Sequence, residues 1–431
     1  MTAPAAVETL GRGAREALQL ERLQGAVAWA VERVAFHRER LASRRVRTLD
    51  DLADLPTMRK SDLREHYPFG LFAVPRGELA RLHASSGTKG KPTVVGYTAG
   101  DLDVWREVMA RAMAAAGCRA GDTLHVAFGY GLFTGGLGFH DGAERLGMTV
   151  VPASSGNTAR HILLLQDFRP AGLCATPSFA LHIAETLEAQ GGDGRRLGLR
   201  YAMYGAEPWT EGMRGALERA FGCPAYDVYG LSEIIGPGVA GECEARDGLH
   251  IADDHFLPEI VDPRTGSVLP AGAEGELVLT TLTKRAMPMI RYRTGDITTL
   301  TDAPCRCGRT TARMARIKGR SDDMLVIKGV NLYPSEVEGT LLAVDELVPH
   351  YQLVVDRSST LARLEVQVEP AAAVVEACGG FDASHPTLVE LRRRVGERLS
   401  RAIGLSIELT LMAPRTVPRS EGKAVRVVEK G

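Results

Sequence analysis

A short segment between residues 85 and 91 combines hydroxyl groups, glycines and a cation. Within the stretch HASSGTKGKPTVVGYT these residues are Ser85, Ser86, Gly87, Thr88, Gly90 and Lys91. Hydroxyls, unobstructed backbone N–H groups and a positive charge together suit a polyphosphate. The segment does not match the pattern G-x-x-x-x-G-K-[ST], because Gly87 lies only three residues before Gly90. Taken alone, it would equally fit a flexible surface turn.

Further motifs follow this segment in a fixed order. They are YGLSE at 229–233, YRTGD at 292–296, GRSDD at 319–323 and PRSEGK at 418–423. Together they resemble the adenylate-forming acyl-CoA synthetase superfamily. Within it the chain is most similar to the phenylacetate-CoA ligase family, through ASSGTKGKPTVVGYT, GYGLFTGGLG, GAERLG, YGAEPWT, YGLSEIIGPGVAGEC, RSDDMLVIKGVNLYPSEVE and PRSEGKAVRV. The resemblance runs over nearly the whole chain.

The resemblance implies a reaction in two steps. The carboxylate of an aromatic acid attacks the α-phosphate of MgATP, giving an acyl-adenylate and pyrophosphate, and the CoA thiol then displaces AMP. An alternative keeps the adenylate but passes the acyl group to a carrier protein, an amine or a hydroxyl. An inactive nucleotide-binding relative would need one of Glu233, Asp296, Arg320 or Lys423 to be missing, and all of them are present.

The resemblance also implies a role for each of these residues. Lys423 would be the catalytic lysine, because attack of one anion on another needs cations around the phosphoryl group. Glu233 would be the Mg²⁺ ligand, a hard oxygen donor suited to that ion. Tyr229 would stack on adenine. Asp296 would accept both ribose hydroxyls, and Arg320 would add a second nucleotide contact.

Three more groups of residues complete the site that the resemblance implies. Gly205, Ala206 and Glu207 are similar to a loop on the adenine side, although an ordinary turn after a strand remains open for Glu207. Asp322 occupies the family's hinge position, where a short polar junction can absorb a large backbone rotation. Lys328 and Gly329 would contact CoA.

The aryl pocket is expected to need aromatic and aliphatic walls. Candidates are Tyr130, Phe133, Phe139 and Ile234. Asp141 departs from the family, which typically has a tyrosine before GAERLG, and a buried carboxylate is costly unless paired. It could meet an amino or hydroxyl group on an aminobenzoate or hydroxyanthranilate substrate. It could equally pair with Arg145 or His140.

Three cysteines and a histidine have the composition of a structural zinc site. Cys243 and His250 form a Cys-x6-His pair, and Cys305 and Cys307 follow at a distance as Cys-x-Cys. Three thiolates and one imidazole make a closed tetrahedral set for Zn²⁺. The alternative is unpaired buried thiols with a surface histidine. His255 is a weaker fifth candidate.

The elements that must position these residues form an α/β pattern. From about 100 to 300, helical periodicities alternate with the β-rich runs DTLHVAF, MTVVPA, GLCATP, RYAMYGAE and AYDVYGLSE. EIVD, GELVLTTL and MIRYRTGDITTL predict a β-rich subdomain of antiparallel strands over 258–300. Residues 14–42 predict one amphipathic helix.

We therefore expect two domains. The first is a large N-terminal adenylation domain of several subdomains, residues 1–321, and the second is a small mobile α/β C-terminal AMP-ligase domain, residues 322–431, which carries Lys423.

The chain has 52 Lys plus Arg against 53 Asp plus Glu and no long block of one sign, which argues against nucleic acid or an anionic membrane as partner. Charges interrupt the first thirty residues, so we expect a cytoplasmic enzyme, and we expect a homodimer.

Overall fold

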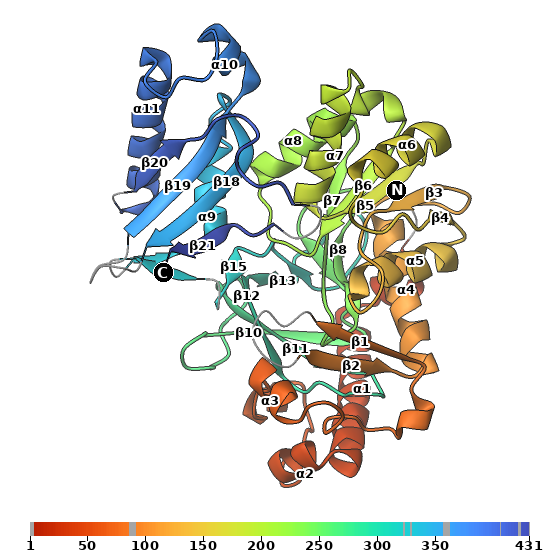
Figure 1. Cartoon of the computed structure of the whole chain (residues 1–431). Coiled ribbons are helices and arrows are strands. Elements are labelled where there is room, and N and C mark those ends of the chain that lie inside the picture. Colours follow the sequence, from red (N-terminus) through yellow and green to blue (C-terminus); the bar gives the residue numbers. More distant parts are fainter. Residues whose placement is uncertain are drawn as a thin grey trace.

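The protein forms a large N-terminal α/β body and a smaller α/β body at the C-terminal end (Figure 1). The structure is a computed structural model, and it describes residues 4–85, 92–321, 324–327, 330–356, 363–405, 407–420 and 424–430. Within these ranges, no helix is both long and apolar enough to cross a membrane. The expected α/β fold with a second, smaller C-terminal unit is confirmed.

A nine-stranded mixed sheet organises the large body, in the order β13-β14-β9-β8-β7-β6-β5-β3-β4. The strands β4, β3, β5, β6 and β7 run parallel, and the remaining pairs are antiparallel. The strands are β3 (Thr123–Val126), β4 (Thr149–Val151), β5 (Gly172–Ala175), β6 (Tyr201–Gly205), β7 (Ala225–Leu231), β8 (Gly236–Glu242), β9 (Leu249–Ile251), β13 (Leu300–Thr301) and β14 (Arg313–Met314). The β-rich runs predicted between 100 and 235 are β3 to β7.

Helices cover both faces of the parallel strands. These helices are α4 (Ala99–Ala115), α5 (Thr134–Leu146), α6 (Thr158–Phe168), α7 (Pro177–Ala189) and α8 (Glu211–Phe221). Ala202 and Tyr204 of β6 pack with α6, α7 and α8, whereas Met203 packs with α4 and α5. This alternation follows from the two-residue period of a strand. Thr176 and Thr210 cap the N-termini of α7 and α8 by accepting backbone hydrogen bonds.

A second, antiparallel sheet of order β10-β11-β12-β15 matches the β-rich subdomain predicted from the sequence. Its strands are β10 (Phe256–Val261), β11 (Gly275–Thr281), β12 (Tyr292–Thr298) and β15 (Gly319–Arg320). A separate antiparallel pair of strands, β1 (Arg81–Ser85) and β2 (Thr93–Tyr97), precedes and follows the segment 86–91 in the sequence.

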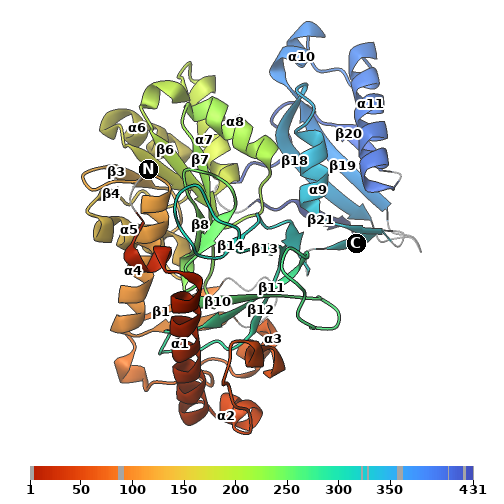
Figure 2. The same ribbon diagram turned by 180° about the vertical axis from the view of Figure 1, so that it is seen from behind.

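The prediction of a single N-terminal helix over 14–42 is wrong, because the structure has two helices there. The segment is divided into α1 (Arg12–Arg33) and α2 (Ala35–Leu41) by Val34, whose backbone is extended (φ −118°, ψ 118°). Leu23, Val27 and Ala30 of α1 pack against Leu257 and Ile290. Figure 2 shows α1 running beside β10 and β11. The short helix α3 (Lys60–Glu65) follows.

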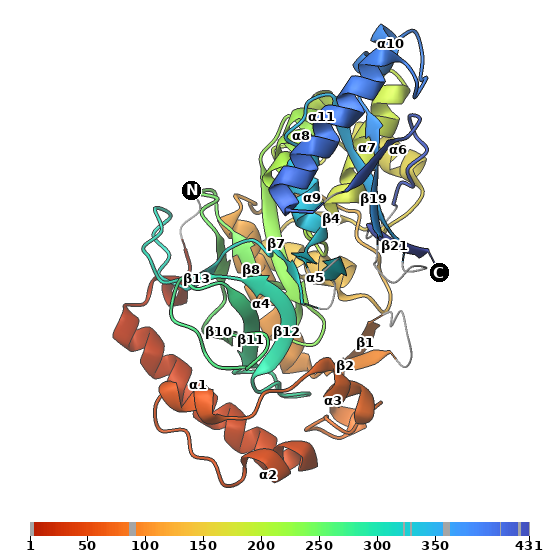
Figure 3. The same ribbon diagram turned by 90° about the vertical axis from the view of Figure 1, so that its left-hand side faces the viewer.

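The C-terminal body has its own sheet, of order β20-β19-β18-β21. Its elements are β16 (Leu325–Ile327), β17 (Val330–Leu332), α9 (Pro334–Leu341), β18 (Leu347–Asp356), β19 (Arg363–Pro370), α10 (Ala372–Ala377), α11 (Pro386–Ile403), β20 (Glu408–Leu411) and β21 (Val427–Lys430). Leu388, Leu391, Val395 and Leu399 form the buried stripe of α11, with helical spacing. Figure 3 views this body from the side on which α11 lies.

Candidate active site

A large cavity lies where the motifs of the N-terminal body converge. Its volume is about 1110 Å³. The residues predicted to bind the nucleotide or Mg²⁺ that line it are Gly205, Ala206, Glu207, Tyr229, Glu233, Asp296 and Arg320. Gly205 and Tyr229 lie at or near the carboxyl ends of β6 and β7, the usual place for a ligand in a parallel α/β sheet.

Several predicted site residues lie outside the described part of the chain. They are Ser86, Gly87, Thr88, Gly90, Lys91, Asp322, Lys328, Gly329 and Lys423. Ser85 is the last residue of β1. Ala84 and Pro92, which flank the segment 86–91, both line the cavity.

The Asp296 carboxylate is held from two sides at the cavity wall. Tyr229 Oη donates to Asp296 Oδ2 at 2.6 Å, and Arg320 Nη1 donates to Asp296 Oδ1 at 3.0 Å. β12 and β15 bring Asp296 and Arg320 together, since the two residues are register partners. Burial, with the negative charge of Asp296, raises the pKa of Tyr229, so this phenol stays protonated and donates. The three residues form one preorganised acceptor.

The Glu233 loop is fixed through its backbone carbonyls. Lys284 Nζ donates to the Glu233 carbonyl at 3.0 Å, and Tyr97 Oη donates to the carbonyls of Ser232 and Ile235 at 3.2 and 3.0 Å. Burial lowers the pKa of Lys284 to about 8. The Glu233 carboxylate lies 3.6 Å from Lys60 Nζ, which also lines the cavity.

The sequence analysis missed Lys60, Tyr97 and Lys284. Of the three, only Tyr97 lies inside a motif, as the residue before the last of HASSGTKGKPTVVGYT. Their proximity to Glu233 results from long-range packing, and no local spacing announces it.

The backbone beside β6 is tightly constrained. A Cβ atom on Gly205 would lie 2.2 Å from the Val228 carbonyl oxygen, and a Cβ on Gly230 would lie 1.9 Å from the Gly236 carbonyl oxygen. Ala206 has φ +70°, a left-handed conformation that costs free energy in a residue with a side chain. Such strained backbone is common where a loop borders a ligand.

The structure brings together only some of the residues that were predicted to form the aryl pocket. Tyr130, Phe133 and Phe139 line the cavity. Ile234 is buried in the core cluster around Trp105 and is not among the residues that line it. Asp141 is also not among the residues that line the cavity, and it forms a 2.7 Å ion pair with Arg81. The alternatives that paired Asp141 with Arg145 or His140 therefore named the wrong partner, since the nearest cation comes from β1.

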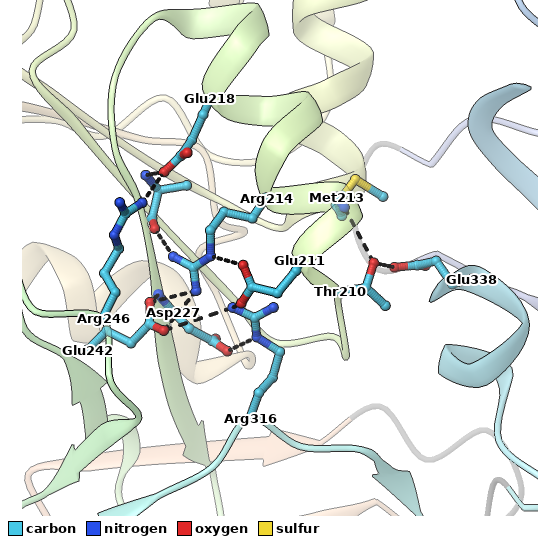
Figure 4. A network of polar contacts seen from close by, with 11 residues as sticks. Thr210, Glu211, Met213, Arg214, Glu218, Asp227, Glu242, Arg246, Arg316 and Glu338 are labelled. Atoms are coloured by element: carbon cyan, nitrogen blue, oxygen red, sulfur yellow. Dashed lines mark hydrogen bonds and ion pairs between the residues drawn. The ribbon is translucent and has the colours of Figure 1, made fainter. Parts of the chain in front are cut away.

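A network of ion pairs and hydrogen bonds between arginines and carboxylates lies next to the site (Figure 4). Arg214 of α8 donates to Glu242 of β8 at 2.7 Å and to Glu211 at 3.0 Å. Arg316 donates to Asp227 at 3.2 Å, and its guanidinium lies 4.6 Å from the Trp209 ring. Burial raises the pKa of Asp227, although Arg316 and Arg214 oppose this. The network ties α8 to β7 and β8.

The four predicted metal ligands converge. The ligand atoms of Cys243, His250, Cys305 and Cys307 all lie within 4.8 Å of one another, and all four residues are buried. Cys243 Sγ is 3.8 Å from Cys305 Sγ, and Cys307 Sγ is 3.4 Å from His250 Nε2. Ligands of a tetrahedral zinc ion at usual bond lengths are about 3.5–3.8 Å apart, so the donor set fits the ion.

The environment of His250 also fits a metal ligand. Its Nδ1 lies 3.0 Å from Thr311 Oγ1, which orients the ring so that Nε2 faces the cysteines. Burial lowers the pKa of His250 to about 4, which keeps the imidazole neutral. His255, the weaker candidate, is not part of this cluster; its Nδ1 contacts Thr283 Oγ1 at 2.8 Å.

Two family models match the chain, which defines the class of protein. The model described as AMP-binding enzyme matches residues 27–283, and the model described as AMP-binding enzyme C-terminal domain matches residues 329–430. The protein is therefore an adenylate-forming enzyme.

Individual relatives narrow this class. The chain is 53% identical to the phenylacetate-coenzyme A ligase of Thermus thermophilus, with 98% of each chain covered. The structure matches that of 2-hydroxyisobutyryl-CoA ligase in the postadenylation state with a TM-score of 0.92 at 31% identity, covering 98% of this chain and 91% of the other. The TM-score is 0.72 against the same ligase in its thioesterification state, at 32% identity and with the same coverage. The chain belongs to the phenylacetate-coenzyme A ligase family and is an AMP-forming CoA ligase.

Proposed function

We propose that this enzyme activates an aromatic carboxylic acid with ATP and transfers the acyl group to CoA. The observation that carries the proposal is one cavity that is lined by two chemically different sets of side chains. Polar groups that suit a nucleotide, Tyr229, Asp296 and Arg320, line it together with the aromatic side chains of Tyr130, Phe133 and Phe139. The names of the relatives, phenylacetate-coenzyme A ligases, support the choice of an aromatic acid.

In the first step, a carboxylate oxygen of the acid bonds to the α-phosphorus of ATP and pyrophosphate leaves. Asp296, fixed by Tyr229 and Arg320, accepts the ribose hydroxyls and orients the nucleotide. Glu233 is suited to hold Mg²⁺, which supplies positive charge to the phosphates when bound. Lys423, outside the described residues, supplies a further cation. In the second step, the CoA thiolate bonds to the acyl carbon and AMP leaves.

For the acid itself we propose phenylacetate or a close arylacetate. The alternative, an amino- or hydroxy-substituted benzoate, depended on Asp141 facing the substrate. Asp141 already has Arg81 as a charged partner at 2.7 Å. A carboxylate paired in this way has less need of a donor on the substrate ring.

The test is acid-dependent pyrophosphate release with phenylacetate, benzoate, anthranilate and 3-hydroxyanthranilate, each with and without CoA. We expect the highest kcat/KM with phenylacetate, together with CoA-dependent AMP release. Pyrophosphate release without any CoA-dependent AMP release would instead favour a carrier protein, an amine or a hydroxyl as acceptor. No acid-dependent pyrophosphate release from the folded enzyme would contradict the proposal.

We further propose that Cys243, His250, Cys305 and Cys307 hold a structural zinc ion. With four protein ligands no position is left open for a substrate, so the ion would stabilise the fold and would not take part in catalysis.

We also propose that the boundary between the two domains lies between residues 321 and 322, that Asp322 is the hinge, and that Lys328 and Gly329 lie near CoA. The homodimer stays a prediction, and size-exclusion chromatography with light scattering would test it.

A further inference from the structure

The carboxylate of Glu207 bridges the two bodies of the protein. Its Oε1 accepts a hydrogen bond from the backbone N–H of Ser178 at 2.7 Å. Its Oε2 accepts one from the backbone N–H of Ala424 at 2.8 Å. Ser178 lies in the first turn of α7 in the N-terminal body, whereas Ala424 precedes β21 in the C-terminal body.

The first of these contacts fixes the carboxylate. The N-terminus of a helix has unpaired backbone N–H groups and a partial positive charge, both of which favour a carboxylate. With Oε1 held by the Ser178 N–H, the orientation of the Glu207 carboxylate is defined. The second oxygen is thereby presented to the other body.

The second contact lies next to the expected catalytic lysine. Ala424 directly follows Lys423 in the sequence. A chain fixed at the amide of one residue limits where the side chain of the preceding residue can reach. A single hydrogen bond at this amide therefore bears on catalytic geometry.

Neighbouring contacts join the same two bodies. Arg426 Nη2, from the C-terminal body, donates to Ser178 Oγ at 3.3 Å. Thr210 Oγ1 donates to the buried Glu338 carboxylate at 3.0 Å, as Figure 4 shows. Glu207 is distinct among these groups because it also lines the cavity.

The arrangement that contains these contacts matches one state of a solved relative. The TM-score is 0.92 against the postadenylation state and 0.72 against the thioesterification state. Contacts between the two bodies thus belong to the arrangement that accompanies the adenylate.

We propose that Glu207 is a positioning residue for adenylation: it docks the backbone at Ala424 onto α7 and so sets the reach of Lys423 in the first half-reaction. This rests on the proposed function. It differs from the role in nucleotide binding that the sequence suggested for the Glu207 side chain, because both carboxylate oxygens already bind protein N–H groups.

The test separates the two half-reactions in Glu207→Gln. An amide has only one acceptor oxygen, so it can satisfy one of the two N–H groups but not both. We expect kcat for pyrophosphate release to fall about tenfold or more, with KM for ATP within about twofold of wild type. Thioester formation from preformed acyl-adenylate and CoA is expected to keep the wild-type rate.

Two further variants sharpen the comparison. Glu207→Asp keeps the charge but is one methylene shorter, so it should also lose the contact with Ala424 and slow adenylation. Glu188→Gln changes an exposed glutamate on α7 in the same way and should leave both half-reactions unchanged. Equal slowing of both half-reactions in Glu207→Gln, or a raised KM for ATP with unchanged kcat, would overturn the proposal.

A second readout does not need turnover. Hydrogen exchange of the peptide that contains Ala424 should be faster in Glu207→Gln than in wild type and in Glu188→Gln. If wild type releases no pyrophosphate but this difference is seen, the proposed function fails while the docking contact stands. If exchange is the same in all three proteins, the docking contact is refuted whatever the activity.

Discussion

At the scale of single residues, Asp141 and Arg81 form an ion pair that lies outside the lining of the cavity. Asp141 belongs to α5, and β1 supplies its partner Arg81 at 2.7 Å. The two side chains are only 11% and 22% exposed, so each depends on the other to compensate for lost hydration. The pair joins the strands β1 and β2 to α5, close to the aromatic residues of the cavity.

Replacing Asp141 by Asn tests this interpretation. The amide leaves the Arg81 charge without a counter-ion, and we expect the free energy of unfolding to fall by about 1–3 kcal/mol. The order of preference among the four test acids should not change. Urea unfolding and kcat/KM for each acid measure the two effects.

Asp103→Asn is a suitable control, because Asp103 is 73% exposed and its ion pair with Arg106 should contribute little. If Asp141→Asn left stability unchanged but altered the preference for amino-substituted acids, Asp141 would instead be a residue that determines substrate specificity.

At the scale of elements, the helices and strands that could be predicted from the sequence are those that a local pattern of residues determines. Five parallel strands were found because each is a short apolar run bounded by turn residues. The break at Val34 was missed because apolar spacing continues across it. The ion pairs of Lys60 with Glu233 and of Arg81 with Asp141 could not be predicted, since the two partners in each pair come from distant segments.

The proposed zinc site belongs to the scale of elements, because its four candidate ligands lie in separate segments. His250 lies in β9, Cys243 directly follows β8, and Cys305 and Cys307 lie in the connection between β13 and β14. We expect one zinc ion per chain by elemental analysis. Cys305→Ser should reduce the zinc content and lower Tm by several degrees, since a closed four-ligand site contributes directly to folding.

Cys378→Ser is the matched control, because Cys378 lies outside the cluster and is only half-buried. It should change neither the zinc content nor Tm appreciably. A protein purified in the presence of zinc that contains no metal, and whose Tm does not respond to a chelator, would refute the site.

At the scale of the whole molecule, buried histidines make stability depend on pH. Burial is the main cause that lowers the pKa of His37 to about 4 and that of His125 to about 3. In the unfolded chain both titrate near 6.5. The folded state therefore binds fewer protons, and stability falls as pH drops below about 6.5.

We expect each of these histidines to remove about 2 kcal/mol of stability between pH 7.5 and pH 5. Urea unfolding at the two pH values measures the loss. His37→Gln should reduce the difference between them by that amount, because glutamine does not titrate. An unchanged difference would show that His37 is protonated in the folded protein without cost.

The two bodies are expected to change their arrangement between the half-reactions. Glu207 and Thr210 of the large body bind Ala424 and Glu338 of the small one, and His350 lies 2.6 Å from Glu185. The match to one state of 2-hydroxyisobutyryl-CoA ligase is much better than to the other, although the covered length is the same. These contacts must break if the small body rotates to admit CoA.

Asp322→Pro tests whether rotation occurs at the expected hinge. Proline fixes φ near −65° and also restricts the preceding residue, so it should hinder a large backbone change at this junction. We expect pyrophosphate release to stay within about threefold of wild type, while thioester formation from acyl-adenylate slows by more than about tenfold. Asp322→Ala removes the same carboxylate but leaves the backbone free to rotate, so it should retain most of both activities. If proline slowed the two half-reactions equally, or if alanine slowed thioester formation as much as proline, rotation about residue 322 would not be the step that separates them.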